Sequence, residues 1–205
     1  VEDRELSTYE FLVEGAPLEK VAMETEISGL SIVPATIDLS SADIDLISNE
    51  KRSHLLHEAL RKKQENKKKY DFILIDCPPS LNILTVNAMV ASHSVLIPLQ
   101  SEFFALEGLS QLLLTVKEVR QTANENLRVE GIVLTMFDGR NNLSKQVEAD
   151  ARSNLKELVF KTIIPRNVRV SEAPSYSMPV LTYDPSSKGS KAYMDLAKEL
   201  LANNS

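Results

Sequence analysis

A short apolar segment that ends in a carboxylate constrains this chain more than any other feature. Residues 72–75 are Phe, Ile, Leu and Ile, and they are followed at once by Asp76, Cys77 and two prolines. An apolar run of this length, rich in β-branched residues and bounded by breakers, is typical of a parallel strand buried on both faces. Proline lacks the N–H group of a strand ladder, so we expect the strand to end just after Asp76. The pattern predicts a carboxylate at the carboxyl end of a buried strand, where open α/β sheets bind their ligands.

The composition suits a globular α/β protein. The chain has 205 residues, of which 43% are hydrophobic and 25% are charged. This length can build one domain with a sizeable core, so we predict a single domain over residues 1–205. We see no apolar run near the roughly 20 residues that span a bilayer and no secretory signal pattern. The single cysteine excludes a disulfide framework. We therefore expect a cytoplasmic protein without a membrane partner.

The net charge of −6 argues against a surface that is basic throughout and built for nucleic acid. A small basic patch, above all one assembled by dimerisation, remains compatible with this charge. Basic residues are concentrated at residues 61–63 and 67–69, after a predicted helix. Cations at a helix C-terminus complement its dipole and stay solvated, so we interpret this run as a solvated surface.

Helix and strand patterns alternate along the chain. Ser7 and Glu10 have capping-box spacing and predict a short helix that ends near Gly15. Strands separated by helices imply βαβ crossovers and a mostly parallel sheet with helices on both faces. The other predicted helices cover residues 38–47, 53–63, 83–91, 108–122, 143–158 and 187–201, and the other predicted strands cover residues 30–34, 94–99, 129–136 and 161–165.

The segment around Asp76 resembles a known nucleotide-site element. A hydrophobic strand that ends in Asp is similar to the Walker B element of P-loop nucleotide hydrolases, although such residues also cap helices. Residues 75–81, with the sequence IDCPPSL, resemble the switch II segment of the ParA/Soj family of chromosome and plasmid partition ATPases. Further segments resemble the same family in the expected order, namely residues 32–36, 102–109, 134–138, 164–169, 171–175 and 183–185. The resemblance extends over nearly the whole chain and implies a P-loop NTPase-like α/β fold.

One part of the family pattern is not found in this sequence. Family members carry a deviant Walker A loop, a Gly-rich phosphate cradle with lysines and threonines, followed by an Asp-Pro switch I. The chain has only 6 glycines and no Gly-x-x-x-x-Gly-Lys sequence, and Val1 aligns just after switch I. We therefore expect about the C-terminal three-quarters of the family domain, without its P-loop strand and helix. The backbone N–H groups and lysines that hold phosphates would be missing, so we expect this chain alone to be inactive toward ATP.

The resemblance also implies the roles of several residues on the nucleotide side. Asp76 corresponds to the switch II carboxylate that holds Mg²⁺, usually through water, and takes part in catalysis. Thr135 and Met136 end a predicted strand where the family contacts the base. The loop that borders the adenine and ribose of ATP or ADP corresponds to Pro165, Arg166 and Asn167. Read from its residues alone, that loop is an ordinary turn with a proline breaker.

Arg140 and Arg169 are the DNA-contact candidates that the resemblance implies. ParA-type ATP dimers bind DNA without sequence preference, and phosphate contacts of this kind give salt-dependent affinity. Four other basic residues are either further DNA contacts or solvated surface residues, namely Lys145, Arg152, Lys188 and Lys191. The resemblance thus implies a nucleoid-associated homodimer that partitions DNA and is stimulated by a ParB/Spo0J-type centromere-binding partner.

Two other functions remain open at this stage. A MinD-like division-site ATPase would end in an amphipathic, basic membrane-targeting helix, and we see no such extension in residues 197–205. A non-catalytic module that binds a partner or DNA would result if the phosphate loop were absent from the gene. Cys77 has no Cys/His constellation beside it, so we predict a buried, inert thiol.

Overall fold

The computed structural model describes residues 6–42, 46, 49, 51–61 and 70–204. Its packing divides the chain into two compact units. Unit 1 comprises Val1–His93 and Thr115–Leu127, and unit 2 comprises Ser94–Leu114 and Arg128–Ser205. The single domain expected over residues 1–205 therefore stays a prediction.

Unit 1 begins with the predicted capping box. The backbone N–H of Ser7 donates to Oε2 of Glu10 at 2.6 Å, and the N–H of Tyr9 donates to the Ser7 hydroxyl at 3.2 Å. The Ser7 hydroxyl also donates to the Glu10 carboxylate, and this bond lowers the pKa of Glu10. The helix ends at Gly15, whose φ of 73° lies in the left-handed region that glycine adopts without strain. This helix is confirmed, with residues 10–14 in π-helical form.

Two apolar clusters form the core of unit 1. Phe11 packs with Leu18 and Val21, while its neighbour Leu12 packs with Ala42 and Leu46. The elements that carry or flank these clusters are η1 (Glu10–Glu14), α1 (Leu18–Val21), β1 (Met23–Glu24), β2 (Ser31–Ile32), η2 (Ile37–Ser41), α3 (Leu55–Arg61) and α4 (Ile83–Ala91). β1 and β2 pair antiparallel. The helix predicted over residues 38–47 is seen only as η2, because several of its later residues lie outside the described part of the chain.

The buried strand predicted over residues 72–75 is wrong. The structure has no regular secondary structure there, and Phe72, Ile73 and Leu74 are all exposed, Leu74 by 84%. A strand forms only when a neighbour satisfies its N–H and C=O groups, and none of the strands in the described residues pairs with this segment. The predicted burial is wrong as well, because the described part of unit 1 offers no surface that covers the apolar run.

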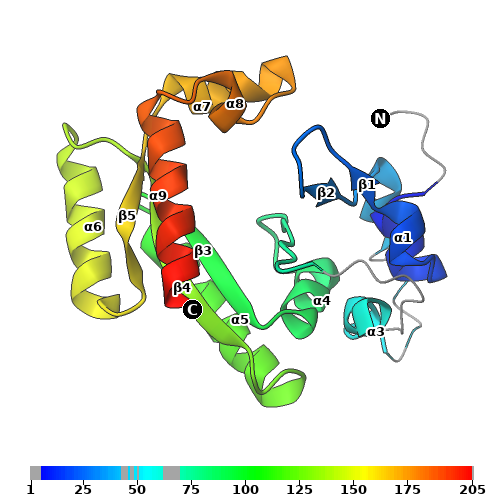
Figure 1. The fold of residues 1–205 in the computed structure, drawn as a ribbon. Helices are drawn as coiled ribbons and strands as arrows, with labels where there is room; N and C mark the ends of the chain where they lie inside the picture. Colours follow the sequence, from blue (N-terminus) through cyan, green and yellow to red (C-terminus); the bar gives the residue numbers. More distant parts are fainter. Residues whose placement is uncertain (1–5, 43–45, 47–48, 50, 62–69, 205) are drawn as a thin grey trace. The chain divides into compact units, whose positions relative to one another are not determined.

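Unit 2 contains a three-stranded parallel sheet in the order β3-β4-β5. The three strands run side by side in Figure 1. They cover β3 (Ser94–Gln100), β4 (Arg128–Phe137) and β5 (Val159–Pro165). The helices of this part of the chain are α5 (Ala105–Thr122, of which the residues after Leu114 belong to unit 1), α6 (Asn142–Leu155), α7 (Val168–Glu172), η3 (Ala173–Tyr176), α8 (Val180–Tyr183) and α9 (Lys188–Asn203).

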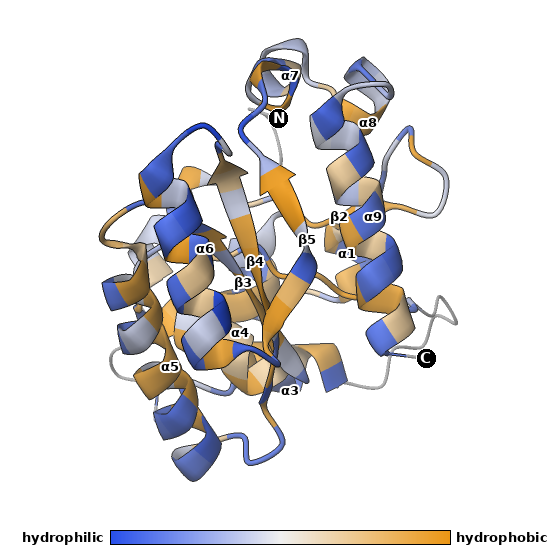
Figure 2. Cartoon of the chain, turned by 90° about the vertical axis from the view of Figure 1, so that its left-hand side faces the viewer, coloured by the Kyte–Doolittle hydropathy of each residue, from blue (hydrophilic) through white to orange (hydrophobic). Residues whose placement is uncertain are grey.

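Alternate residues of the strands face opposite sides of the sheet. Ile132 and Leu134 of β4 pack with residues of α5 and α6 on one face. Val133, between them in the sequence, packs with Phe160 and Leu196 on the other face, which α9 covers. Figure 2 shows α5 and α6 on one side of the strands and α9 on the other. A parallel sheet with helices on both faces is therefore confirmed.

Gly131 accommodates a bulge between β3 and β4. The register shifts there, so that Val95 lies opposite Val129 and Leu96 lies opposite Gly131. A Cβ atom at Gly131 would overlap the ring of Phe160 and lie 3.0 Å from the carbonyl oxygen of Leu158. The bulge therefore requires glycine and lets the Phe160 ring fill the space where a side chain would stand.

The segment from Val168 to Tyr183 contains three short helices, α7, η3 and α8, that the sequence did not predict. Each has only four or five residues. Such elements are too short to show a helical period of apolar residues. Asn167 caps α7 by accepting the N–H of Arg169 at 3.0 Å, and Pro174 and Pro179 stand at the starts of the next two helices.

Glu199 ties α9 to the edge strand β5. Its two carboxylate oxygens accept the backbone N–H groups of Lys161 at 2.7 Å and Thr162 at 2.9 Å. Partial burial pushes the pKa of Glu199 upward, but the hydrogen bonds from Thr162 and Lys161 outweigh it and hold the pKa below its usual value. A carboxylate with a lowered folded-state pKa contributes stability above its unfolded-state pKa and loses it as the pH falls through the folded-state value.

We expect Glu199→Gln to lower the free energy of unfolding by about 1 kcal/mol at pH 7, because glutamine offers one acceptor oxygen where two N–H groups need one each. The difference between wild type and variant should shrink as the pH falls through the lowered folded-state pKa of Glu199, because the wild-type carboxylate becomes protonated there. Urea unfolding across this pH range measures both values. A difference that stays constant with pH would contradict a stabilising role for the ionised Glu199 carboxylate.

Candidate functional site

The carboxyl ends of the three parallel strands meet along one edge of the sheet in unit 2. Ser101, directly after β3, donates its backbone N–H and its hydroxyl to the carbonyl oxygen of Thr135, both at 3.1 Å. Arg166, directly after β5, donates its N–H to the carbonyl oxygen of Phe137 at 2.9 Å. These bonds extend the ladder by one residue past the strands. The residues that follow β3, β4 and β5 therefore lie side by side, and we call them the carboxyl edge.

Met136 has an unusual backbone at this edge. Its φ is 53°, in the left-handed region that few residues other than glycine adopt. Its side chain is partly exposed, at 38%. Such a conformation costs roughly 1–3 kcal/mol and persists where the surrounding structure enforces it, often beside a ligand site. The hydrogen bonds that hold Thr135 and Phe137 on either side supply this constraint.

The loop after β5 is fixed from several directions. Pro165 ends β5 opposite Phe137, and the Arg166 guanidinium lies 3.9 Å from the Glu102 carboxylate after β3. Asn167 uses its side chain to cap α7. The first turn of α9 packs closely here, since a Cβ on Gly189 would lie 3.3 Å from Cγ of Asn167 and overlap Val170. Pro165, Arg166, Asn167, Thr135 and Met136 are thus brought together at the carboxyl edge.

Arg140 lies in the turn between β4 and α6. Its backbone N–H and its Nε each donate to Oδ1 of Asp138 at 3.0 Å, and its Nη2 donates to Oδ2 at 2.9 Å. These hydrogen bonds and the guanidinium charge lower the pKa of Asp138 to about 2. The Asp138 carboxylate is therefore ionised at any pH near neutrality. The Arg140 side chain is 92% exposed in spite of this pair.

Arg169, on α7, belongs to a second cluster of charges. Its Nη1 lies 2.9 Å from Glu172, and its Nε lies 3.4 Å from Asp184. Glu172 also accepts the hydroxyl of Tyr183 at 3.4 Å, and the Tyr183 ring stacks on Tyr176 at a centroid distance of 4.9 Å. The bond to Glu172 raises the pKa of Arg169 above its ordinary value. The arginine therefore joins α7 to α8.

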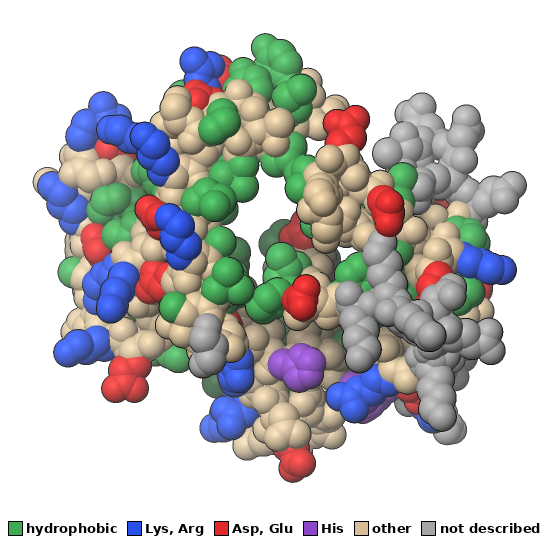
Figure 3. Space-filling view, viewed as in Figure 1, with side chains coloured by type: hydrophobic (Ala, Val, Ile, Leu, Met, Phe, Trp, Pro, Cys, Tyr) green, Lys and Arg blue, Asp and Glu red, His purple; other side chains and the backbone are tan. Residues whose placement is uncertain are grey.

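Several Lys and Arg side chains gather on the face of α6 and α9 seen in Figure 3. Arg152 is paired within its own helix to Glu148 at 2.9 Å. Lys145, Lys188 and Lys191 are exposed.

Asp76 belongs to unit 1, whereas the carboxyl edge belongs to unit 2. It is exposed, and its carboxylate has no hydrogen bond or ion pair with any residue that the structure describes. A free, solvated carboxylate suits a magnesium ion, which is commonly held through one carboxylate, phosphate oxygens and water. Within the described residues, no three His, Cys, Asp or Glu side chains converge into a metal site.

Cys77 is exposed, so its predicted burial is wrong. Partial desolvation of the sulfur and the charge of Asp76 raise the pKa of its thiol. A raised pKa keeps the thiol protonated and weakens it as a nucleophile.

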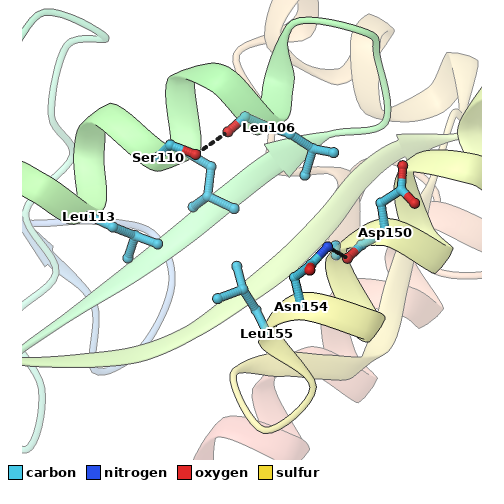
Figure 4. Close-up of a pocket in the computed structure, with 8 residues that line it drawn as sticks. Leu106, Ser110, Leu113, Asp150, Asn154 and Leu155 are labelled. Atoms are coloured by element: carbon cyan, nitrogen blue, oxygen red, sulfur yellow. Dashed lines mark hydrogen bonds between the residues drawn. The ribbon is translucent and has the colours of Figure 1, made fainter.

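A cavity of about 220 Å³ lies between α5 and α6 in unit 2. Figure 4 shows its leucine-rich walls, with polar groups bound within their own helices. The Ser110 hydroxyl donates to the carbonyl of Leu106 at 2.9 Å, and the Asn154 amide donates to the carbonyl of Asp150 at 2.8 Å. The cavity contains none of the predicted site residues, so it is a packing feature of the sheet face.

Comparisons with known proteins agree on one class. A family model described as an AAA domain matches residues 1–129. Cobyrinic acid a,c-diamide synthase from Mycobacterium smegmatis, solved with bound ADP and magnesium, is 32% identical with a TM-score of 0.80 and matches 98% of this chain and 73% of its own. Together with the parallel sheet and its helices, these matches show an α/β protein with the fold of the P-loop NTPase class.

Two curated relatives narrow the class further. The chromosome partitioning protein ParA of Caulobacter vibrioides (strain NA1000 / CB15N) is 49% identical over 97% of this chain and 74% of its own. The sporulation initiation inhibitor protein Soj of Bacillus subtilis (strain 168) is 48% identical over 98% of this chain and 78% of its own. The chain belongs to the ParA/Soj family of partitioning proteins. None of the helices in the described ranges combines the length and apolar character needed to cross a bilayer.

Two residues of the carboxyl edge were missed by the sequence interpretation. Asp138 follows β4 directly, so the same strand-end rule that singled out Asp76 could have found it. Glu102 lies two residues beyond β3, and its proximity to Arg166 depends on strand order. No local signal in the sequence could have revealed the pair of Glu102 and Arg166.

We expect Met136→Val to lower the free energy of unfolding by about 1–2 kcal/mol, because a β-branched side chain is poorly tolerated at a positive φ. Met136→Gly is the matched variant and should cost less, since glycine adopts this backbone freely and the side chain is partly exposed. Urea unfolding of the two variants gives the comparison. Equal losses in both would show that the side chain, and not the backbone, determines stability at this position.

Proposed function

We propose that this protein is an ATP-dependent DNA-partitioning ATPase, in which Mg-ATP drives a homodimer onto DNA without sequence preference. The observation that carries this proposal is the identity of 48–49% to ParA and Soj proteins over 97–98% of the chain. A ParB/Spo0J-type centromere-binding protein would stimulate hydrolysis and thereby release the dimer from the nucleoid. The bound ADP and magnesium of the Mycobacterium smegmatis structure support the cofactor assignment.

The nucleotide-side roles are those that the family resemblance implies, and the position of each residue supports them. The free carboxylate of Asp76 would hold magnesium through water and orient the attacking water as a catalytic residue. Met136 and the preceding Thr135 would border the base. The constrained backbone of Met136 would hold its N–H and C=O groups in one orientation there. Pro165, Arg166 and Asn167 would close the base and ribose side from β5. Mg-ATP supplies the phosphoryl group that is transferred to water.

The DNA-side roles rest on two exposed guanidinium groups. Arg140 stands on the turn before α6, and Arg169 stands on α7. A guanidinium offers two parallel donors to a phosphate, which fixes position without reading the base sequence. A chain with a net charge of −6 gains from having two such sets side by side, so dimerisation and DNA binding would be linked.

We expect Arg140→Glu, in the protein as its gene encodes it, to weaken DNA binding by at least about tenfold with Mg-ATP at moderate salt. The slope of log affinity against log salt should also become shallower by about one unit per protomer, since the variant no longer neutralises one phosphate. Fluorescence anisotropy with a labelled duplex of arbitrary sequence measures both values.

The matched control is Lys156→Glu, which makes the same charge reversal at the other end of α6. It should change affinity by no more than about twofold, because Arg140 and Lys156 are separated by the length of the helix. Arg140→Ala should act in the same direction as Arg140→Glu. Unchanged DNA binding in both Arg140 variants would remove Arg140 from the proposed interface.

The nucleotide site leads to a second expectation for residues 1–205 alone. We expect them to bind ATP more weakly than micromolar, because the sequence contains no Gly-x-x-x-x-Gly-Lys loop to enclose the phosphates. Isothermal titration with Mg-ATP measures this affinity. Micromolar binding would show that the chain holds phosphates by residues other than a P-loop.

A further inference from the structure

The Arg140 guanidinium binds the Asp138 carboxylate in the same geometry in which a guanidinium binds a phosphate. Nε and Nη2 reach the two oxygens of Asp138 at 3.0 and 2.9 Å, which is a bidentate pair. Phosphate and carboxylate present the same pair of acceptors to a guanidinium. A DNA phosphate and Asp138 therefore require the same donors of Arg140.

Asp138 uses its carboxylate to bind Arg140. All of its side-chain hydrogen bonds among the described residues go to the backbone and the guanidinium of Arg140. The positive charge of Arg166 also contributes to the lowered pKa of Asp138. Asp138 is 29% exposed against 92% for Arg140, so the carboxylate sits against the turn while the arginine lies in solvent. The arginine is the member of the pair that can turn away.

The second arginine is paired in a different way. Arg169 contacts Glu172 and Asp184, and each of these carboxylates also binds other groups. Glu172 accepts the Tyr183 hydroxyl, and Asp184 accepts the N–H and hydroxyl of Ser186 at 3.1 and 2.8 Å. Those carboxylates serve the packing of α7 and α8 as well as the arginine. Of the carboxylates that pair with the two candidate arginines, Asp138 is the one whose side-chain hydrogen bonds among the described residues all go to a single arginine.

We propose that Asp138 is an intramolecular competitor that DNA phosphate must displace from Arg140, and that it sets DNA affinity below what the arginine alone would give. The inference rests on the proposed function, in which Arg140 contacts DNA. An exposed ion pair contributes little stability and is screened by salt, so a phosphate can replace the carboxylate readily. The returning carboxylate would in turn favour release of the DNA. Asp138 is thus a residue that tunes affinity and residence time.

Asp138 also shapes the turn, and its charge can be separated from that role. Oδ1 accepts the N–H of Arg140 two residues on, while the carbonyl of Asp138 accepts the N–H of Asn141 at 2.9 Å. Asparagine forms the same side-chain turn with its own Oδ1. Asp138→Asn therefore keeps the acceptor that the turn needs, while it removes the charge and the Oδ2 acceptor of the Arg140 Nη2 bond.

The test compares DNA binding of wild type and Asp138→Asn in the protein as its gene encodes it, with Mg-ATP and a labelled duplex. We expect affinity to rise by about two- to fivefold, the range expected for loss of one exposed ion pair. The rise should be larger at low salt, and dissociation measured by stopped-flow should be slower. Unchanged or weaker binding would overturn the proposal.

Two controls separate competition from a general effect of charge. Glu157→Gln removes a charge from an exposed carboxylate that has no partner among the described residues, and it should change affinity by less than Asp138→Asn does. In an Arg140→Ala background, Asp138→Asn should no longer raise affinity, because the competing pair is already gone. A rise of equal size in that background would overturn the proposal. If Arg140→Ala alone leaves DNA binding unchanged, the proposed role of Arg140 fails, which is a different result from a failure of Asp138→Asn alone.

Discussion

The parallel pairing of β3, β4 and β5 is the constraint on which the rest of unit 2 depends. Because the strands run in one direction, their carboxyl ends come to the same edge, and the bonds from Ser101 and Arg166 extend that alignment past the strands. Residues distant in sequence thereby become neighbours, as the approach of Arg166 to Glu102 shows. The bulge at Gly131 sets the register of the sheet that leads to this edge.

Charge at this edge is arranged in local pairs of opposite sign. Glu102, Arg166, Asp138 and Arg140 follow the ends of the three strands, and each arginine has a carboxylate within reach. Exposed pairs of this kind add little to folding stability, so their placement is not explained by stability alone. What they do is fix the direction of side chains that would otherwise sample many rotamers in solvent. An incoming anion must exchange with the carboxylate that holds such a guanidinium.

The sequence predicted elements well where they bury a regular apolar pattern and poorly where they do not. The helix at Ile83–Ala91 has the predicted bounds, because its periodicity and its cap at Asn82 are local. The strand at residues 72–75 failed because strand formation depends on a neighbour, which an apolar run cannot reveal. The helices α7 and α8 were missed since they are too short for periodicity. Asp138 could have been found by the strand-end rule, whereas the Glu102–Arg166 pair required the strand order.

Local pairing also reconciles an acidic chain with the proposed affinity for DNA. A net charge of −6 opposes the approach of a polyanion at long range, and this opposition is largely screened beyond about 8–10 Å at physiological salt. At short range, the proposed binding would exchange one acceptor for another on the guanidinium. The affinity per protomer would then be small, since each phosphate that binds an arginine must first replace a carboxylate. In the proposed dimer, doubling the number of arginines that bind phosphate would raise affinity steeply, because the second set would bind at the high effective concentration that the first creates. An acidic protomer with paired arginines would in this way suit a DNA interaction that depends on its state of assembly.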